Sequence, residues 1–217
     1  VSKGSYELTA KFSIGSTNID TKYFQNISTL VKTRLALKRL IGLKYKLKLN
    51  RTKSVHNKPP PPFITSTIQQ EASNKYNISP KSTMSILQKL YEGGKITYMR
   101  TDSPVISSEF REICKGYINK HYTKQFTKRS YKAKTKNAQE AHECIRPVLL
   151  DITEDDIADS YEKKLYGLIW RRTVSCFLPD YIENVSIYHF YPNAKEYFET
   201  IKKTVVQSGF RVLYNDR

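Results

Sequence analysis

The stretch LKYKLKLNRTKSVHNKPPPPFITSTIQQEASNKY, residues 43–76, contains the change of pattern that decides the fold. Apolar residues alternate strictly with lysines from Leu43 to Leu49, which predicts a half-buried strand with a lysine face. The four prolines at 59–62 cannot join a helix or the interior of a sheet, so they indicate a stiff extended connector. Helical patterns follow them. The connector is either a domain boundary or, on the prolines alone, an ordinary surface loop.

Strand patterns lie on both sides of the helical part of the chain. Residues that favour β structure predict strands at 6–14, 181–191, 197–206 and 209–214. Helical spacing at 27–40 predicts an amphipathic helix with a basic outer face that ends at Gly42. We therefore predict an α+β fold, in which a helical domain at 59–181 is inserted into a discontinuous, mostly antiparallel β domain at 1–58 and 182–217.

Start and stop signals divide the helical part into several helices. Ser66 or Thr67 is predicted to cap the first helix. Ser79 is predicted to cap the second, with Pro80 at its first position and Gly93 after its end. Further helices are predicted at 108–121, from 137 to before 147, and from 153 toward 177, the last with three acidic residues in its first turn.

The net charge of +17 is distributed in long stretches of one sign. Between Asp20 and Glu71 there are eleven Lys and Arg and no acid, and between Glu112 and Glu140 there are eight and again no acid. Such stretches indicate a polyanionic partner, most often nucleic acid, although a generally basic surface is the alternative. No stretch approaches the roughly 20 apolar residues of a membrane span, so no membrane partner is expected.

The three cysteines stand apart from one another, and the four histidines lack metal-ligand spacing. This pattern predicts neither a zinc ribbon nor a disulfide framework. Unpaired thiols favour a reducing, intracellular setting. We expect this chain to bind no metal itself.

The segment KITYMRTDS, residues 95–103, holds the residues best suited to chemistry. It follows Gly94 and begins with β-branched residues, so we predict an extended strand with Ile96, Tyr98 and Arg100 on one face. A guanidinium stabilises a nearby phenolate, can hold a phosphate oxygen by a two-pronged contact, and meets the charge that develops in the transition state. A tyrosine ester would also store the energy of the broken phosphodiester. For a Tyr-x-Arg taken alone, a sheet tyrosine beside a surface cation is the favoured alternative.

Three motifs together resemble the catalytic helical domain of type IA DNA topoisomerases. PPFITSTIQQEA at 61–72 resembles the entry to that domain, and GKITYMRTDS at 94–103 resembles the active-site tyrosine motif in its bacterial topoisomerase I form. NAQEAHECIRP at 137–147 resembles the third signature of the same domain. The resemblance is strong from about residue 60 to 147, and the flanks fit only in pattern.

The resemblance implies a mechanism and a set of site residues. Tyr98 would attack a single-stranded phosphodiester and form a transient 5′-phosphotyrosyl link. Strand passage through a gate and religation would then relax negatively supercoiled DNA without ATP. The β domain would form the arch that opens the gate. Arg100 would bind the scissile phosphate, and the other residues implied to contact DNA are Thr101, Asp102, Glu140, His142 and Arg146.

The family's other half-site is a Toprim domain, which supplies a Glu, a Lys and an Asp-x-Asp pair that binds magnesium. No Asp-x-Asp in the expected strand–helix frame occurs here, and Asp155-Asp156 sits at a helix start instead. We therefore expect Mg2+ to be held by a Toprim domain in cis or on a separate chain. We also expect the isolated chain to bind DNA weakly and to relax nothing. The expected location is intracellular and DNA-associated, in the cytoplasm or nucleoid, or the protein is virus-encoded.

Two other functions are consistent with parts of the sequence. The helices at 79–121 suit a helix-turn-helix that binds duplex DNA without catalysis, and a silent structural relative is the other alternative. The basic stretch at 115–136 interleaves aromatic residues, which favours single-strand binding and core packing about equally. Those aromatic residues are Tyr117, Tyr122, Phe126 and Tyr131.

Overall fold

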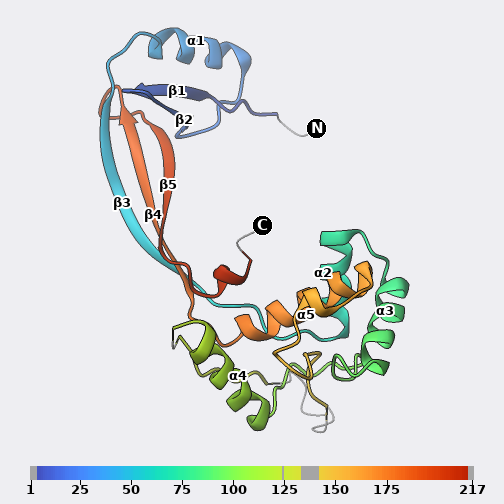
Figure 1. Ribbon diagram of the computed structural model, residues 1–217. Helices are drawn as coiled ribbons and strands as arrows, with labels where there is room; N and C mark the ends of the chain where they lie inside the picture. The colour runs from blue at the N-terminus through green and yellow to red at the C-terminus, as the bar shows by residue number, and fades with distance from the viewer. Residues whose placement is uncertain (1–3, 124, 133–141, 215–217) are drawn as a thin grey trace. The chain divides into compact units, whose positions relative to one another are not determined.

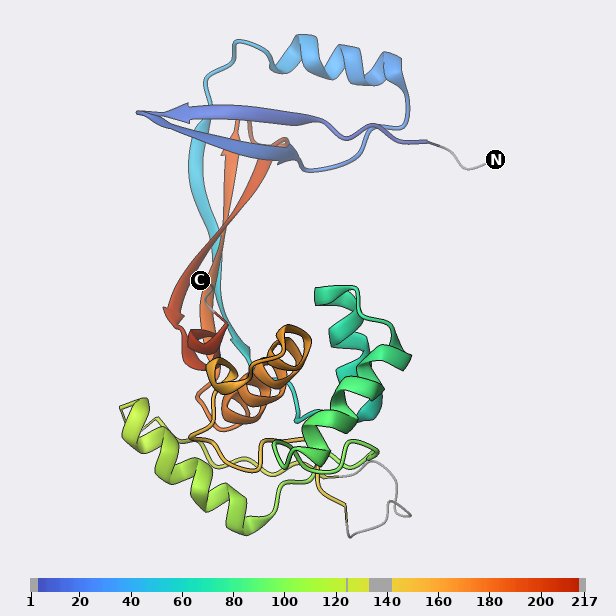
Figure 2. The same cartoon turned by 45° about the vertical axis from the view of Figure 1, so that its right-hand side comes forward.

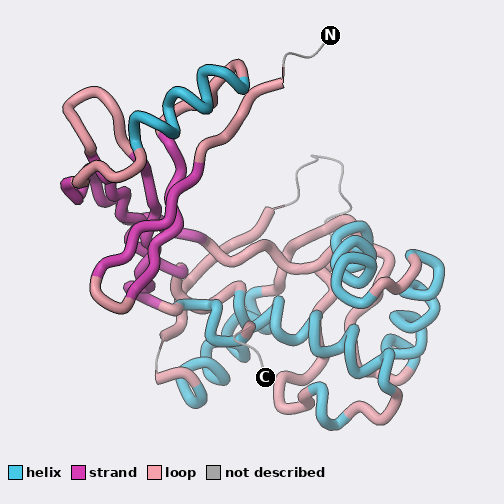
Figure 3. Tube along the Cα trace, turned by 90° about the horizontal axis from the view of Figure 1, so that it is seen from above, coloured by secondary structure: helices cyan, strands magenta, loops and turns pink. Residues whose placement is uncertain are grey.

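The structure, a computed structural model, describes residues 4–123, 125–132 and 142–214. It divides into two compact units. The β unit comprises Val1–His56 and Ile182–Val206, and the helical unit comprises Asn57–Tyr181 and Gln207–Arg217. The chain is thus α+β, with the strands gathered in one unit and most of the helices in the other (Figure 3).

The β unit is built on a five-stranded antiparallel sheet whose spatial order is β1-β2-β5-β4-β3. β1 and β2 form a tight hairpin, which runs from the pair Thr9 and Lys22 to the pair Ile14 and Thr17. One helix, α1, lies across this hairpin (Figures 1 and 2). The elements are β1 Thr9–Ile14, β2 Thr17–Tyr23, α1 Leu30–Leu40, β3 Lys46–Asn57, β4 Tyr181–Tyr191 and β5 Phe198–Gln207.

The core of the β unit is small, and two predictions about it are wrong. The apolar face predicted for the strand at 43–49 is not buried. Leu47 and Leu49 on β3 are 47% and 49% exposed, which classes both as surface residues. Helix α1 buries Ala36 and Leu40. Leu35, one of the apolar residues whose helical spacing predicted a buried face, is instead 60% exposed. Ala36 and Leu40 pack in one buried cluster with Leu8 and Tyr23, and this contact sets which side of α1 faces inward. The hairpin strand β2 was not predicted.

The helical unit contains the remaining elements and two buried clusters that share Trp170. Its single tryptophan therefore lies where the two clusters meet. None of the helices in the described part of the chain is long and apolar enough to cross a membrane. The elements are α2 Thr65–Tyr76, α3 Pro80–Glu92, α4 Ser108–His121, the 3-10 helix η1 Glu154–Asp156, α5 Ser160–Ser175 and the 3-10 helix η2 Gly209–Leu213.

Several helix ends are as predicted. The Ser79 hydroxyl accepts a hydrogen bond from the Ser82 amide at 3.2 Å, Pro80 opens α3, and Gly93 follows its end. Helix α4 has the predicted bounds, and the hydroxyl of Ser107 caps it. These caps satisfy amides that the helix itself leaves without partners.

Other helix starts differ from the prediction. Helix α2 begins at Thr65 after Ile64, and the Thr67 hydroxyl accepts from the Ile64 amide at 3.0 Å, so neither Ser66 nor Thr67 is the cap. The region from 153 is broken into η1 and α5, because Asp159 accepts from two amides and restarts the helix. Residues 137–141 of the helix predicted from 137 lie outside the described residues, and the prediction is wrong for residues 142–146, which form no helix because Ile145 bridges to Phe63 instead.

The strand predicted at 209–214 is also wrong, and this segment belongs to the helical unit. Gly209 has a φ of +49°, and an added Cβ there would lie 2.2 Å from the Asp180 carbonyl oxygen. Phe210 is buried and its amide donates to the Pro179 carbonyl at 2.9 Å. This close approach turns the chain after β5, so residues 209–213 form the 3-10 helix η2 and not a strand.

Candidate active site

The segment at 94–103 connects α3 to α4 and is not the regular strand predicted. Gly94 has a φ of +65°, which reverses the chain after α3, and the Lys95 amide donates to the Leu90 carbonyl at 2.9 Å. Only Ile96 forms a bridge, an antiparallel one to Pro147. Irregular backbone here leaves the segment dependent on side-chain and long-range contacts for its shape.

Side chains in this segment separate into an exposed set and a buried set. Tyr98 is 41% exposed, and Arg100 and Asp102 are also exposed. Met99 and Thr101, which alternate with them, are 1% and 8% exposed. Tyr98 and Arg100 are therefore both accessible to solvent, and their position on one shared face stays a prediction.

The prediction that Ile96 lies on the same face as Tyr98 is wrong. It is 1% exposed and belongs to the larger buried cluster of the helical unit. Burial of an isoleucine side chain stabilises by roughly 1.5–3 kcal/mol, which outweighs a regular alternation. Ile96 and Met99 thus anchor the two sides of Tyr98 in the core.

The three sequence motifs meet in the structure although they lie far apart in the chain. Backbone hydrogen bonds connect the first motif to the third, and each of these to the tyrosine segment. Two distant parts of the chain, the first and third motifs, therefore hold the segment that contains Tyr98. The bonds are Ile145 N to Phe63 O at 2.9 Å, Thr65 N to Thr101 O at 2.9 Å, Thr97 N to Arg146 O at 2.9 Å and Val148 N to Lys95 O at 3.0 Å.

The hydroxyl of Thr97 adds a second connection to the third motif. It donates to the Cys144 carbonyl at 2.7 Å and accepts from the Arg146 amide at 3.0 Å. The residue immediately before Tyr98 is thus held through both its backbone and its side chain. Sequence spacing gave no sign of this contact.

The ring of Tyr98 lies against the ring of Tyr91 at the end of α3. Their centroids are 5.3 Å apart and their planes are inclined by 68°. This edge-to-face geometry is the favoured one for aromatic pairs. Since both rings are 41% exposed, the pair orients the Tyr98 ring and still leaves it accessible.

Arg146, predicted to contact DNA, is engaged within the protein. Its guanidinium bonds to the Glu143 carboxylate, with Nε at 3.0 Å, and stacks 3.8 Å from the centre of the Phe110 ring. Glu143 also accepts from the Ser107 amide at 2.7 Å, at the start of α4. Burial acts to raise the pKa of Glu143, but the bonds from Ser107 and Arg146 outweigh it and lower that pKa. This network joins the third motif to α4.

The remaining predicted DNA contacts are placed differently from one another. The Thr101 hydroxyl faces inward and accepts from the Ser103 amide at 3.1 Å. Asp102 and His142 are exposed. Glu140 lies outside the described residues. The structure thus presents Tyr98, Arg100, Asp102 and His142 to solvent, and it turns Thr101 toward the protein.

The aromatic residues of the basic stretch at 115–132 pack against the second buried cluster. Phe126 stacks on Phe177 with ring centroids 5.6 Å apart, and the Tyr131 hydroxyl donates to the Cys176 carbonyl at 3.1 Å. Burial is the main reason why the pKa of Tyr131 is raised. Of the two interpretations left open, these contacts favour core packing over base stacking for Phe126 and Tyr131.

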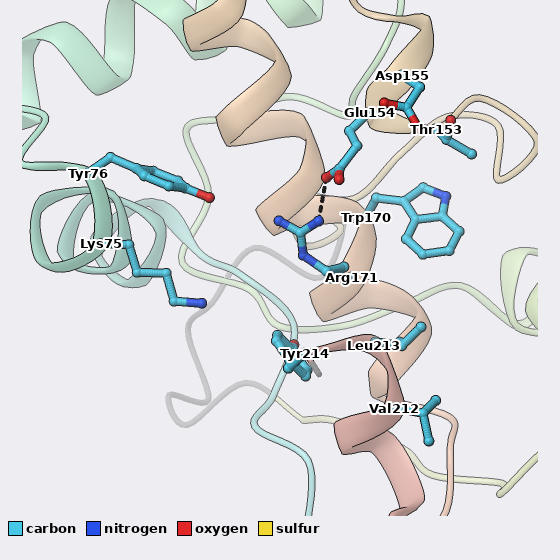
Figure 4. Close-up of a pocket in the computed structure, with 10 residues that line it drawn as sticks. All are labelled: Lys75, Tyr76, Thr153, Glu154, Asp155, Trp170, Arg171, Val212, Leu213 and Tyr214. Atoms are coloured by element: carbon cyan, nitrogen blue, oxygen red, sulfur yellow. Dashed lines mark hydrogen bonds and ion pairs between the residues drawn. The ribbon is translucent and has the colours of Figure 1, made fainter. Parts of the chain in front are cut away.

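A large pocket of the helical unit lies elsewhere. Figure 4 shows Lys75 and Tyr76 projecting from α2 toward Arg171 on α5, with Glu154 paired to Arg171. The pocket encloses about 740 Å³, and neither Tyr98 nor Arg100 lines it. Its cations have carboxylate partners, since Lys75 lies 3.3 Å from Glu71. This pocket is therefore separate from the predicted reactive residues.

The described residues contain neither a cluster of metal-ligand side chains nor an exposed cysteine. No group of three or more His, Cys, Asp or Glu in that part of the chain could hold a metal ion. The magnesium that the family resemblance implies therefore has no fitting site among them. All three cysteines are buried, and burial raises the pKa of the Cys114 and Cys176 thiols to about 12, so neither is prepared to act as a nucleophile.

Comparisons with known proteins agree with the motifs. A family model described as DNA topoisomerase matches residues 1–217. The chain is 40% identical over 179 residues to DNA topoisomerase 1 of Rickettsia felis, covering 76% of this chain and 23% of that protein. It is 41% identical over 189 residues to the prokaryotic-type DNA topoisomerase 1 of Acanthamoeba polyphaga mimivirus, covering 82% of this chain and 22% of that protein. The chain thus spans less than a quarter of the length of these relatives.

A solved structure has a similar fold. It is that of full-length topoisomerase I from Thermotoga maritima, with a TM-score of 0.78 and 24% sequence identity. The match covers 99% of this chain and 36% of that one. At this identity the likeness concerns the fold, and it extends over both units.

Proposed function

Because this chain belongs to the DNA topoisomerase family, in its type IA branch, we propose that it supplies the nucleophile and the gate of a type IA enzyme. The observation that carries the proposal is the exposure of Tyr98 and Arg100 on a segment that the other two motifs hold in place. The substrate in this proposal is single-stranded DNA, cut within a negatively supercoiled duplex. The site of action is DNA inside a cell or a virus-infected cell.

The proposed cleavage step is a transesterification. The Tyr98 hydroxyl oxygen attacks the phosphorus, a new P–O bond to tyrosine forms, and the bond from phosphorus to the 3′-oxygen breaks. The phenol loses its proton and the departing 3′-oxygen gains one, so the step is balanced without ATP. Arg100 binds a non-bridging phosphate oxygen and stabilises the charge of the transition state. Religation is the same step in reverse.

The rest of the catalytic machinery is assigned to a Toprim domain, in cis or on another polypeptide. We place the magnesium ligands there, because the described residues of this chain offer no such cluster. In this proposal the 217 residues bind DNA weakly alone and relax nothing, and the β unit acts as the arch of the gate.

The test is covalent capture of DNA. The chain is combined with a Toprim-containing polypeptide, magnesium and an oligonucleotide labelled at its 3′ end. A 5′-phosphotyrosyl link leaves the label on the protein after denaturation, whereas a 5′-labelled oligonucleotide is released with a free 3′-hydroxyl. Tyr98→Phe should abolish the adduct, and Tyr161→Phe, a change at an exposed tyrosine of the same unit, should not.

Arg100→Ala separates binding from chemistry. We expect DNA affinity to change little and cleavage to fall about 100- to 1,000-fold, the usual effect of losing one transition-state contact. Equal cleavage would remove Arg100 from the mechanism. DNA binding without any adduct would instead favour a non-catalytic DNA-binding or structural module.

A further inference from the structure

Thr65, the first residue of α2, contacts the tyrosine segment through its side chain. Its hydroxyl donates toward the Met99 carbonyl at 2.7 Å and toward the Thr101 carbonyl at 3.0 Å, and it accepts from the Thr101 amide at 2.9 Å. The Thr65 amide also donates to the Thr101 carbonyl at 2.9 Å. One residue therefore satisfies backbone groups on both sides of Arg100.

These contacts matter because the backbone they hold is irregular. Residues 97–107 form neither helix nor strand, so no ladder of hydrogen bonds fixes the positions of Tyr98 and Arg100. Thr97 holds the chain just before Tyr98, and Thr65 holds it just after. Reacting groups must lie within about 0.5 Å of the productive geometry, and a displacement of about 1 Å can reduce a rate 100-fold.

We propose that Thr65 is a positioning residue for strand cleavage, one that touches neither DNA nor the reacting atoms but sets the spacing of Tyr98 and Arg100. This inference rests on the proposed function. Thr65 lies in the first motif, 33 residues before Tyr98. The sequence predicted only a helix start near Thr65. In the structure its hydroxyl instead bonds to the backbone of the tyrosine segment.

Three substitutions test the inference. Thr65→Val keeps the shape and removes the hydroxyl, and Thr65→Ser restores it. Thr173→Val is the matched control, because Thr173 is buried in the same unit and its hydroxyl donates to the Ile169 carbonyl of its own helix at 2.8 Å. Unfolding is followed by the fluorescence of Trp170, the only tryptophan, to confirm that each variant is folded.

The chain is combined with a Toprim-containing polypeptide and saturating oligonucleotide. We expect Thr65→Val to lower the single-turnover cleavage rate about 10- to 100-fold while DNA affinity changes less than about twofold. Thr65→Ser should recover most of the rate, and Thr173→Val should leave it near that of the unsubstituted chain. Equal cleavage by Thr65→Val, or an equal loss in Thr173→Val, would overturn the inference.

Hydrogen exchange on the chain alone gives a readout that needs no activity. Removing the Thr65 hydroxyl should speed exchange of the Thr101 amide, and Thr65→Ser should restore its protection. Unchanged exchange in Thr65→Val would also overturn the inference. Failure of the unsubstituted chain to form any adduct would instead sink the proposed function and, with it, the cleavage role of Thr65.

Discussion

The two units bury their apolar residues very differently. In the helical unit, Leu87 and Ile68 are fully buried, and Phe63, Ile96 and Met99 are 1% exposed. In the β unit the buried cluster is limited to the hairpin, α1 and the ends of β4 and β5. The long strands β3 and β5 leave apolar side chains in solvent. Those include Leu47, Leu49, Ile201, Val205 and Val206.

The difference indicates what each unit contributes. The tyrosine segment draws its position from the densely packed unit, where Ile96 and Met99 enter the core beside Tyr98. Close packing transmits small displacements and so suits a site that needs fixed geometry. The β unit has less buried surface to lose on bending, which suits the arch in the proposed function. The comparison can be tested by substitutions made in pairs.

The largest contrast is expected from removing a leucine side chain in each unit. Leu87→Ala leaves a cavity in the helical core and should cost about 2–5 kcal/mol of unfolding free energy. Leu47→Ala on β3 removes a side chain that is 47% exposed and should cost about 1 kcal/mol or less. Urea unfolding, followed by Trp170 fluorescence for the first and by circular dichroism for the second, measures both. Similar losses would remove the contrast in packing.

A second pair compares glycines with positive φ. Gly209→Ala in the helical unit adds a Cβ 2.2 Å from the Asp180 carbonyl oxygen. This overpacking should cost about 1–3 kcal/mol in addition to the backbone strain of a positive φ. Gly42→Ala in the β unit shares a positive φ, +79°, but has no neighbour within 4 Å, so only the backbone strain of about 1–2 kcal/mol applies. Thermal unfolding should therefore start lower for Gly209→Ala. A larger effect at Gly42 would contradict the account of why residues 207–213 leave the sheet.

The smallest effect concerns the pH dependence of the network at Glu143. Its pKa is lowered in the folded chain, so the carboxylate stabilises the fold above the unfolded pKa, about 4.5, and this contribution is lost as pH falls through the folded value. Glu143→Gln should cost about 1 kcal/mol at pH 7 and little in the acid range below both pKa values. Unfolding measured across this range checks the sign. A cost that stays constant or grows toward acid would show that the charge is not what stabilises the network.

Local signals in the sequence predicted local structure well. Ser79, Pro80 and Gly93 fixed the bounds of α3, and β4 has the predicted limits, because caps and β-forming runs act over a few residues. The turn at Gly209 and the break at Asp159 were missed, since they depend on which backbone lies opposite. The strand β2 is a different case, because Ile19, Thr21 and Tyr23 alternate with exposed polar residues and its signal was present in the sequence.

The candidate site was predictable only where local sequence motifs define it. The motifs identified Tyr98 and Arg100, and the structure exposes both. The contacts that hold these residues in place could not be predicted from the sequence, because the hydrogen bond between Thr65 and Met99 joins residues 34 positions apart. Arg146 is charged and was predicted to face DNA, yet Glu143 and Phe110 hold it in the protein. Which charges remain accessible depends on tertiary contacts.

The chain has sixteen tyrosines, and the central claim is that one of them bears the DNA. Trapped adduct should be digested with nuclease and protease, and the peptide that retains a nucleotide identified by mass spectrometry. We expect the modification on the peptide that contains Tyr98, attached through a 5′-phosphate. A nucleotide on any other tyrosine, or a linkage through a 3′-phosphate, would contradict it.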